Sequence, residues 1–245
     1  MNESNRLPRP IKNVVLLPMK AHSARIPDKN FRLFANKPLF RWILDTLAGM
    51  PEIDRIIINT DARAVLEKHG FEESERIMLR DRKAELCGDE VSMNRIIEDD
   101  LSAVASECFL MTHTTNPLLS ADTIRRALEA YENSLPEHDS LFSVNRYQTR
   151  FYREDGSAIN HDPETLLPTQ QLEPWFEENS NLYIFSLESF RSAGRRIGLR
   201  PRLFETPPSE SVDIDNSTNW HIAELLALSK MIGKVSEEEP VSESP

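Results

Sequence analysis

Three basic side chains stand within ten residues of one another, directly after the first apolar run of the sequence. They are Lys20, Arg25 and Lys29, and Ser23 and Asn30 add neutral hydrogen-bonding groups to the same stretch. The whole sequence carries 29 basic and 40 acidic residues, a net charge of −11, so this positive density is local. Such a cluster suits a polyphosphate and the charge that grows on a leaving pyrophosphate. A solvated basic loop would share this composition, and no Gly-Lys-Ser/Thr sequence of a P-loop follows.

Two carboxylates near the C-terminal end form a second candidate site. Asp213 and Asp215 are separated by one residue, and in an extended segment the side chains at i and i+2 point to the same face. Mg²⁺ typically takes one or two carboxylates and completes its octahedron with water and phosphate oxygens. The pair therefore suits a magnesium ion. A turn or a cap of the helix expected at 219–229 is the alternative role.

The composition excludes several classes of protein. An acidic excess argues against nucleic-acid binding, which needs a surplus of Lys and Arg to neutralise phosphates. No apolar run approaches the roughly 18–20 residues that span a bilayer, and residues 1–10 lack the apolar stretch of a signal peptide. Cys87 and Cys108 fit neither a disulfide framework nor a zinc site. With 39% hydrophobic and 28% charged residues, we expect a soluble cytoplasmic protein that binds neither nucleic acid nor membrane.

Short runs of branched apolar residues alternate with helical patterns in the first half of the chain. We expect strands at 13–18, 55–60 and 108–112, and helices at 38–47, 62–69, 92–105 and from Ser120 onward. This alternation predicts right-handed βαβ units on a mostly parallel sheet, which is an α/β fold. Ligands of such sheets bind beyond the carboxyl ends of the strands, which is where the basic loop lies.

The pattern changes after Pro136. Turn-forming and polar-aromatic residues at 145–175 predict an antiparallel arm inserted in the domain, which could reach a neighbouring subunit. We expect strands on either side of it and later, at 141–144, 181–186 and 203–206. We divide the chain into a tail at 1–11, one domain at 12–234 and a disordered acidic tail at 235–245.

Short motifs follow one another in a fixed order from about residue 13 to 230. They are Pro18, Ser23, Arg25-Ile26-Pro27 and Lys29-Asn30 in the loop, then Lys37-Pro38-Leu39, Asn59-Thr60-Asp61, Arg82 to Asp89, Thr115-Asn116-Pro117-Leu118, Glu178-Asn179 with Tyr183, and Asp213-Ile214-Asp215. This ordered set resembles the signatures of the acylneuraminate-type cytidylyltransferases. The resemblance covers almost the whole of the expected domain.

The resemblance implies both a fold and an activity. The fold is a Rossmann-like, mostly parallel sheet of the nucleotide-diphospho-sugar transferase type with an inserted antiparallel dimerisation arm. The activity is transfer of CMP from CTP, the co-substrate, to an α-keto sugar acid similar to N-acetylneuraminate, with release of pyrophosphate. Mg²⁺ is the implied cofactor, a small anionic acceptor the implied partner, and a homodimer the implied assembly.

The resemblance also implies roles for individual residues. The catalytic group is Lys20, Arg25, Lys29 and Asp215, and the metal ligands are Asp213 and Asp215. The CTP-binding group is Lys20, Ala21, His22, Ser23, Arg25, Lys29, Asn30, Arg82 and Asp89. The acceptor-binding group is His113, Thr115, Asn116, Gln170, Asn179 and Tyr183.

Several positions depart from the family pattern. Lys20 replaces an arginine, and Ala21 and His22 replace two glycines, which restricts the backbone of the loop. His113 replaces a glutamine, and Thr169 replaces the arginine of an Arg-Gln pair in the arm. Some of these positions contact the sugar acid in the family. Alternative acceptors are therefore Kdo, legionaminic acid, pseudaminic acid or a phosphonate, and the alternative from another class is a non-catalytic nucleotide-binding relative.

Overall fold

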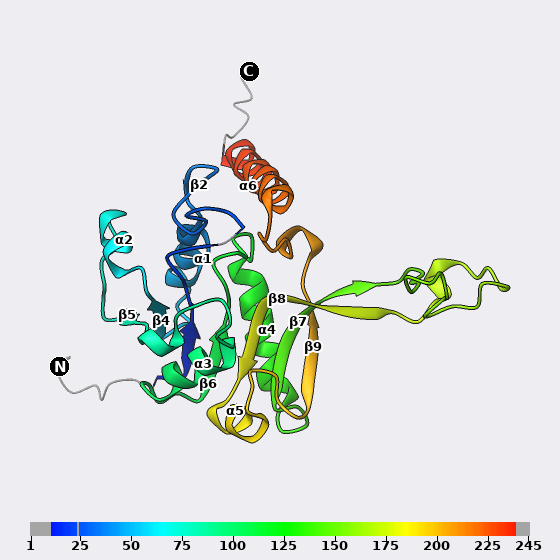
Figure 1. The fold of residues 1–245 in the computed structure, drawn as a ribbon, viewed down its shortest axis with the longest axis horizontal. Helices are drawn as coiled ribbons and strands as arrows, with labels where there is room; N and C mark the ends of the chain where they lie inside the picture. Colours follow the sequence, from blue (N-terminus) through cyan, green and yellow to red (C-terminus); the bar gives the residue numbers. More distant parts are fainter. Residues whose placement is uncertain (1–10, 24, 239–245) are drawn as a thin grey trace, which may run out of the picture.

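A seven-stranded sheet runs through the centre of the protein in the order β5-β4-β1-β6-β8-β7-β9 (Figure 1). This computed structural model describes residues 11–23 and 25–238. The seven strands are β1 (Asn13–Leu16), β4 (Arg55–Thr60), β5 (Ile77–Asp81), β6 (Cys108–Met111), β7 (Ser140–Tyr147), β8 (Trp175–Phe185) and β9 (Pro201–Glu205). A separate hairpin pairs β2 (Leu33–Phe34) with β3 (Lys37–Pro38). Residues 1–10 and 239–245, which make up most of the two expected tails, lie outside the described residues.

Most of the sheet is parallel, as the sequence predicts. β1 pairs in parallel with β4 and β6, and β4 pairs in parallel with β5. β8 is antiparallel to both β6 and β7, while β7 and β9 are again parallel. This arrangement confirms the α/β fold with a mostly parallel sheet. The carboxyl ends of β1, β4 and β6 meet at one edge because these three strands run in the same direction.

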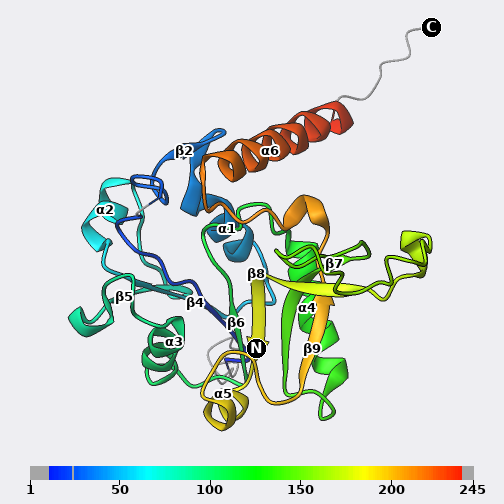
Figure 2. The ribbon, with the colours of Figure 1, turned by 45° about the vertical axis from the view of Figure 1, so that its right-hand side comes forward.

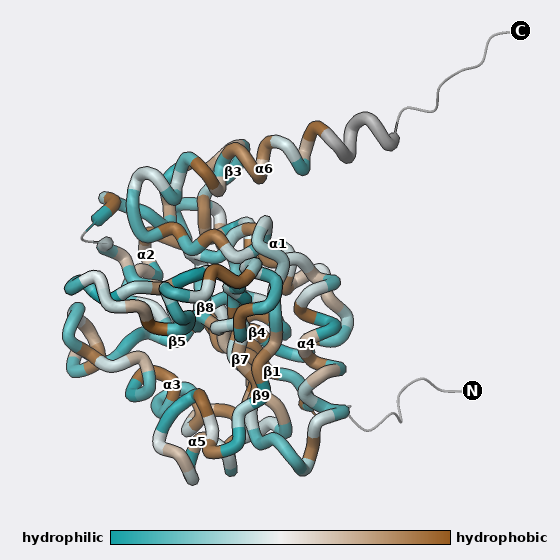
Figure 3. Tube along the Cα trace, turned by 90° about the vertical axis from the view of Figure 1, so that its right-hand side faces the viewer, coloured by the Kyte–Doolittle hydropathy of each residue, from teal (hydrophilic) through white to brown (hydrophobic). Residues whose placement is uncertain are grey.

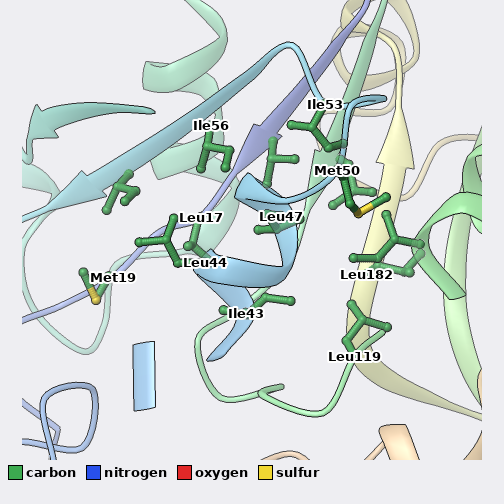
Figure 4. Close-up of a cluster of buried hydrophobic side chains, with 14 of the residues drawn as sticks. Leu17, Met19, Ile43, Leu44, Leu47, Met50, Ile53, Ile56, Leu119 and Leu182 are labelled. Atoms are coloured by element: carbon green, nitrogen blue, oxygen red, sulfur yellow. The ribbon is translucent and has the colours of Figure 1, made fainter. Parts of the chain in front are cut away.

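Helices cover both faces of the sheet. They are α1 (Leu39–Ala48), α2 (Arg63–Lys68), α3 (Met93–Leu101), α4 (Ala121–Ser134), α5 (Leu187–Ala193) and α6 (Ser217–Glu238). Buried side chains of α1 and α4 pack on one face, and those of α3 and α5 on the other. Figure 4 shows Ile43, Leu44 and Leu47 of α1 against Leu17 and Leu182. The spacing of these α1 residues is that of one helix face, which is why this segment is helical rather than extended.

The last helix closes the edge of the sheet beyond the strand ends. Trp220 of α6 packs edge-on against Phe34, with ring centroids 5.3 Å apart, and Ile214 is buried in the same cluster. Figure 3 shows hydrophobic residues gathered along the central strands. Because Ile214 is anchored in this cluster, its neighbours Asp213 and Asp215 are held over the end of the sheet.

An arm leaves the body between β7 and β8 (Figures 1 and 2). The two strands stay paired out to Tyr147 and Trp175, beyond an irregularity between Phe142 and Val144. The chain between them contains one short 3-10 helix, Thr169–Gln171. This antiparallel excursion matches the arm expected at 145–175.

Candidate nucleotide-binding site

The loop after β1 continues past the end of the sheet and returns through Asn30. Leu17 and Met19 still donate backbone hydrogen bonds to β4, at 2.8 and 3.0 Å. Asn30 Nδ2 then donates to the carbonyl oxygen of Lys20 at 2.8 Å, and its Oδ1 accepts from Thr114 Oγ1 at 2.7 Å. Asn30, predicted to contact the nucleotide, is thus buried and holds the shape of the loop.

Each of the three loop cations lies beside a carboxylate, and two of them share Asp215. Lys20 Nζ lies 2.5 Å from Asp89 Oδ1, and Arg25 Nη1 lies 2.8 Å from Asp215 Oδ2. Lys29 Nζ donates to the backbone carbonyl before Asp215 at 2.7 Å and lies 3.9 Å from Asp215 Oδ1. Burial lowers the pKa of Lys29; Asp215 opposes this shift, whereas the charges of Lys20 and Arg25 add to it. Arg25 and Lys29 therefore meet at Asp215, whereas Lys20 pairs with Asp89; Lys20 and Arg25 remain exposed, and Lys29 is largely buried.

Asp213 and Asp215 lie in the segment between β9 and α6. Asp213 Oδ1 is buried and has no hydrogen-bond partner among the described residues, and burial raises the pKa of this carboxyl group. Asp215 is exposed and engaged by Arg25. A buried oxygen without a partner beside a second carboxylate fits the oxygen preference of Mg²⁺. The described residues contain no group of three or more His, Cys, Asp or Glu side chains that could hold a metal alone, so an ion there would need phosphate oxygens and water as further ligands.

Arg82 lies behind the loop. Its Nε donates to Asn59 Oδ1 at 3.0 Å, and its Nη2 donates to the carbonyl oxygens of Asn59 and Met19 at 2.8 and 3.2 Å. Burial lowers the pKa of Arg82. These contacts join the end of β4 to the loop, so the guanidinium supports the loop from within. Asp89, by contrast, is exposed and engaged by Lys20.

Ala21 and His22, which replace the two glycines of the family pattern, lie on a different side of the loop from Arg25. The backbone N–H of Ala21 donates to Asp61 Oδ1 at 2.6 Å. Ala21 and His22 line a separate hollow of about 540 Å³ together with Phe31 and His69. Ser23 is partly buried in the same loop. His22 therefore lies away from the carboxylates that face Arg25.

A hollow of about 780 Å³ opens beside the loop. Arg25, Asp213 and Asp215 line it on one side, and Glu177, Glu178 and Glu205 line it at the root of the arm. Its volume is in the range of small-molecule sites. The hollow thus joins the candidate phosphate and metal groups to the segment that is expected to bind the acceptor.

Three predicted acceptor residues follow β6. Burial, together with the charges of Arg196 and Lys29, lowers the pKa of His113 to about 3, so its imidazole is neutral at physiological pH. The Thr115 carbonyl oxygen accepts from the backbone N–H between the two aspartates at 3.0 Å. Asn116 is buried, and its Nδ2 donates to the carbonyl oxygen of Ser180 at 2.9 Å. The residues of this group differ: His113 faces the charges of the site, whereas Asn116 ties β6 to β8.

The β8 residues of the acceptor group form a connected set. Asn179 Nδ2 donates to Asn145 Oδ1 at 2.9 Å and to Thr206 Oγ1 at 2.7 Å. The hydroxyl of Tyr183 donates to Glu178, whereas Arg196 Nη2 donates to that hydroxyl at 2.8 Å. The sequence around Arg196 indicates no function for this residue. It lies thirteen residues beyond Tyr183, in an arginine-rich stretch that is typical of a solvated surface.

Gln170 lies apart from the other predicted residues. It is exposed, and its backbone carbonyl accepts from Gln148 Nε2 at 2.9 Å within the arm. Figure 1 shows the arm extending away from the loop and from α6. Within a single chain, Gln170 therefore does not contribute to the site.

The fold and this arrangement define an α/β protein of the nucleotidyltransferase type, with a cation-bearing loop and paired carboxylates beyond the strand ends. Residues 14–230 match the sequence profile of the cytidylyltransferases, so the chain belongs to that family. Two solved structures share the fold. A CMP:2-keto-3-deoxy-manno-octonic acid synthetase complexed with CTP has a TM-score of 0.63 at 12% identity, over 89% of this chain and 99% of that one. A 4-diphosphocytidyl-2C-methyl-D-erythritol synthase from Anaerococcus prevotii has a TM-score of 0.62 at 11% identity, over 89% and 96%.

Curated relatives are distant in sequence. An N-acylneuraminate cytidylyltransferase of Streptococcus agalactiae is 24% identical over 86% of this chain, which spans about half (52%) of that relative. A pseudaminic acid cytidylyltransferase of Campylobacter jejuni is 23% identical over 88% of this chain and 96% of its own length. A CMP-N,N'-diacetyllegionaminic acid synthase of Legionella pneumophila is 23% identical, over 87% of this chain and 95% of its own length.

None of the helices in the described part of the chain is both long and apolar enough to cross a membrane.

Proposed function

We propose that the protein transfers CMP from CTP to a small anionic acceptor, an α-keto sugar acid, and releases pyrophosphate. The observation that carries this proposal is the meeting of Arg25 and Lys29 with Asp215 at the end of β1 and β6. Cations that suit a triphosphate and a carboxylate that suits a metal ion lie together in a chain of the cytidylyltransferase family, which supports the proposal.

The chemistry follows from the charges. The acceptor hydroxyl attacks the α-phosphorus in line with the leaving pyrophosphate, and Lys20, Arg25 and Lys29 neutralise the charge that grows on that leaving group. Asp213 and Asp215 would hold Mg²⁺, which screens the phosphate oxygens when bound. Arg25 and Asp215, which pair with each other in this structure, would then divide these roles: the arginine would bind phosphate and the carboxylate would hold the metal. Positioning and neutralisation, without a covalent intermediate, account for the reaction.

Both the nucleotide and the acceptor can be tested in one assay. Pyrophosphate release is measured with CTP, ATP, GTP or UTP against N-acetylneuraminate, Kdo, pseudaminic acid and legionaminic acid, with Mg²⁺. We expect turnover with CTP and with one acid of the panel. The named relatives that use sialic, pseudaminic and legionaminic acids support that choice of acids. CTP binding by calorimetry without turnover on any acceptor would favour the non-catalytic alternative, and no heat from CTP with Mg²⁺ would refute the proposal.

The role of Asp215 gives a sharper test. Asp215→Ala should lower turnover by at least about a hundredfold, because the metal loses a ligand beside the transferring phosphate. The side chain is exposed, so the melting temperature should stay close to that of the parent. Asp122→Ala on α4, which removes another exposed and ion-paired carboxylate, is the matched control and should keep full activity. Near-normal turnover of Asp215→Ala at low Mg²⁺ would remove Asp215 from the metal site.

A further inference from the structure

Arg196 is held in place by three contacts with β8. Its Cζ lies 3.7 Å from the centroid of the Tyr183 ring, and its Nη2 donates to the Tyr183 hydroxyl at 2.8 Å. The same nitrogen lies 3.2 Å from Glu178 Oε1. Its backbone N–H also donates to Asn94 Oδ1 at 3.3 Å. An arginine that only solvates a surface would not be fixed by a ring face, a hydroxyl and a carboxylate together.

The guanidinium keeps unused donors. Nη1 approaches the sulfur of Met111 at 3.8 Å, and a thioether is a weak acceptor. Among the described residues, no oxygen accepts a hydrogen bond from Nη1 or Nε of Arg196. The side chain is 19% exposed, so a ligand can reach it. A guanidinium binds carboxylate, phosphate or phosphonate groups through two parallel hydrogen bonds from neighbouring nitrogens. Both such edges of Arg196 include Nη2, so this mode of binding requires Nη2 to leave Glu178.

The position of Arg196 connects it to the nucleotide side of the site. The charges of Arg196, Lys29 and Asp215 all act on the pKa of His113. Glu178, the partner of Arg196, lines both the large hollow beside Asp215 and a smaller one of about 390 Å³ that Arg196 itself lines. The two hollows thus meet at Glu178, so an acceptor beside this residue would lie between Arg196 and the groups that line the large hollow.

Other basic side chains near these hollows are already engaged. Arg146 lies 3.8 Å from Glu205, and Glu177, Glu178 and Glu205 give the large hollow an acidic wall. In the arm, Arg150 donates to a backbone carbonyl of the arm itself. An anionic acceptor would be repelled by the acidic wall unless a cation met its charge. Arg195 and Arg196 both line the smaller hollow, but of the two Arg196 is the one fixed by a ring face, a hydroxyl and a carboxylate.

We propose that Arg196 binds the anionic group of the acceptor and so selects acids over neutral sugars. This inference rests on the proposed transferase function and deepens it. Glu178 would release Nη2 when the acceptor binds, while the Tyr183 ring keeps the guanidinium in place. Arg196 is assigned to binding and not to the bond-forming step.

The test compares charged and neutral acceptors in kinetic assays. For whichever of the four sugar acids is turned over, kcat and KM are measured with the acid and with its methyl ester, in the parent, Arg196→Gln and Arg196→Lys. We expect the KM for the acid to rise at least about tenfold in Arg196→Gln and less in Arg196→Lys, with the KM for CTP unchanged. The preference for acid over ester should disappear in Arg196→Gln. Arg195→Gln is the matched control, since Arg195 is exposed and donates to the backbone of Ile197, and it should keep the preference.

Each remaining outcome has a defined meaning. Unchanged discrimination in Arg196→Gln, or an equal rise in both KM values, overturns the role of Arg196 while the transferase function stands. If no sugar acid is turned over although CTP binds, ethylphosphonate replaces the acids as the probe, with binding to the CTP–magnesium complex measured by calorimetry. Loss of its binding in Arg196→Gln alone supports an anion site for a phosphonate and refutes the sugar-acid function. Absence of binding in the parent refutes both proposals. Thermal melts of all variants exclude misfolding as the cause.

Discussion

Lys29 differs from the other loop cations in how little water reaches it. Its side chain is 12% exposed, against 42% for Lys20 and 67% for Arg25. Burial lowers its pKa, so as the pH rises its ammonium loses the proton before an ordinary lysine does. A phosphate-binding group that is neutral no longer attracts CTP. Nucleotide affinity should therefore fall on the alkaline side at a lower pH than the usual lysine pKa implies.

We predict that Lys29→Arg moves this alkaline decline to higher pH, because arginine stays charged. Lys29→Ala should lower the affinity for CTP by about tenfold or more at pH 7, and it should change the KM of the acceptor much less. The dissociation constant of CTP is measured by calorimetry between pH 7 and 10, with Lys37→Arg as the control, since Lys37 pairs with Asp45 away from the loop. Identical alkaline profiles for the parent and Lys29→Arg would show that another group controls the decline.

For individual residues, the sequence predicts where charged side chains gather better than it predicts which partner each polar side chain contacts. The convergence of Arg25, Lys29 and Asp215 follows from a loop beyond a parallel strand and a motif order that brings the two segments together. The use of Asn30 and Arg82 as internal supports does not follow, because a polar side chain that binds a ligand and one that binds the backbone have the same sequence signal. The sequence does not predict a role for Arg196, because its partners Tyr183 and Glu178 lie in another element, strand β8.

A buried acidic pair on α3 connects that helix to β4 and β5. Asp100 accepts from Asn59 Nδ2 at 2.7 Å and from Arg80 Nε at 3.0 Å. Burial raises the pKa of Asp100 to about 6, against the opposing effect of these partners. For Asp99, burial also opposes ionisation, but hydrogen bonds from Lys83 and Arg80 outweigh it and lower the pKa. The pKa values of two adjacent carboxyl groups are therefore shifted in opposite directions, up for Asp100 and down for Asp99.

This contrast predicts opposite pH dependences of stability. Asp100 holds its proton more tightly in the folded state than in the unfolded one, so its contribution to stability falls as the pH rises from about 4 to about 6, by at most about 3 kcal/mol. Asp100→Asn should remove that fall. Asp99→Asn should destabilise the folded protein at neutral pH and have little effect at low pH. In the parent protein, the ion pairs of Asp99 are themselves lost as the pH falls through its lowered pKa. Urea unfolding at pH 4, 5.5 and 7 measures both. Parallel pH profiles for the two variants would contradict the assignment.

The elements themselves follow closely from hydrophobic pattern. Strand β4 has the bounds expected for it, 55–60, because its apolar run is buried on both faces of the sheet. β5 and α5 were not predicted: β5 is an edge strand of mixed burial, and α5 is only seven residues long. Neither has enough buried residues to show a clear period. The helix expected at 92–105 ends at Leu101.

At the scale of the whole molecule, the arm is the feature that a single chain does not explain. It carries exposed apolar side chains, among them Tyr152, Leu166 and Trp175, and it places Gln170 far from the rest of the site. Packing against a second copy would cover these side chains and bring Gln170 to a partner's hollow. We therefore expect the full chain to be a homodimer in which the arms complete the sites.

Replacing residues 148–174 by Asn-Gly tests this expectation. The pair Tyr147–Trp175 ends the β7–β8 ladder, so a two-residue turn can join the strands there. The shortened chain should be a monomer by light scattering, should bind CTP within about threefold of the parent, because the loop and the aspartates are untouched, and should lose most of its turnover. A shortened chain that remains dimeric would show that another surface holds the subunits together.

Strand β8 belongs both to the arm and to the central sheet. Its eleven residues run from Trp175 at the root of the arm, through Glu178 and Tyr183 beside Arg196, to Phe185 in the core. The same strand thus carries a projecting limb and the groups that hold the guanidinium, on either side of the irregularity in its pairing with β7. We expect a second copy that packs on the limb to shift Glu178, which lies only three residues along this strand from Trp175. Assembly and acceptor preference are therefore properties that should change together, even for substitutions made at the tip of the limb.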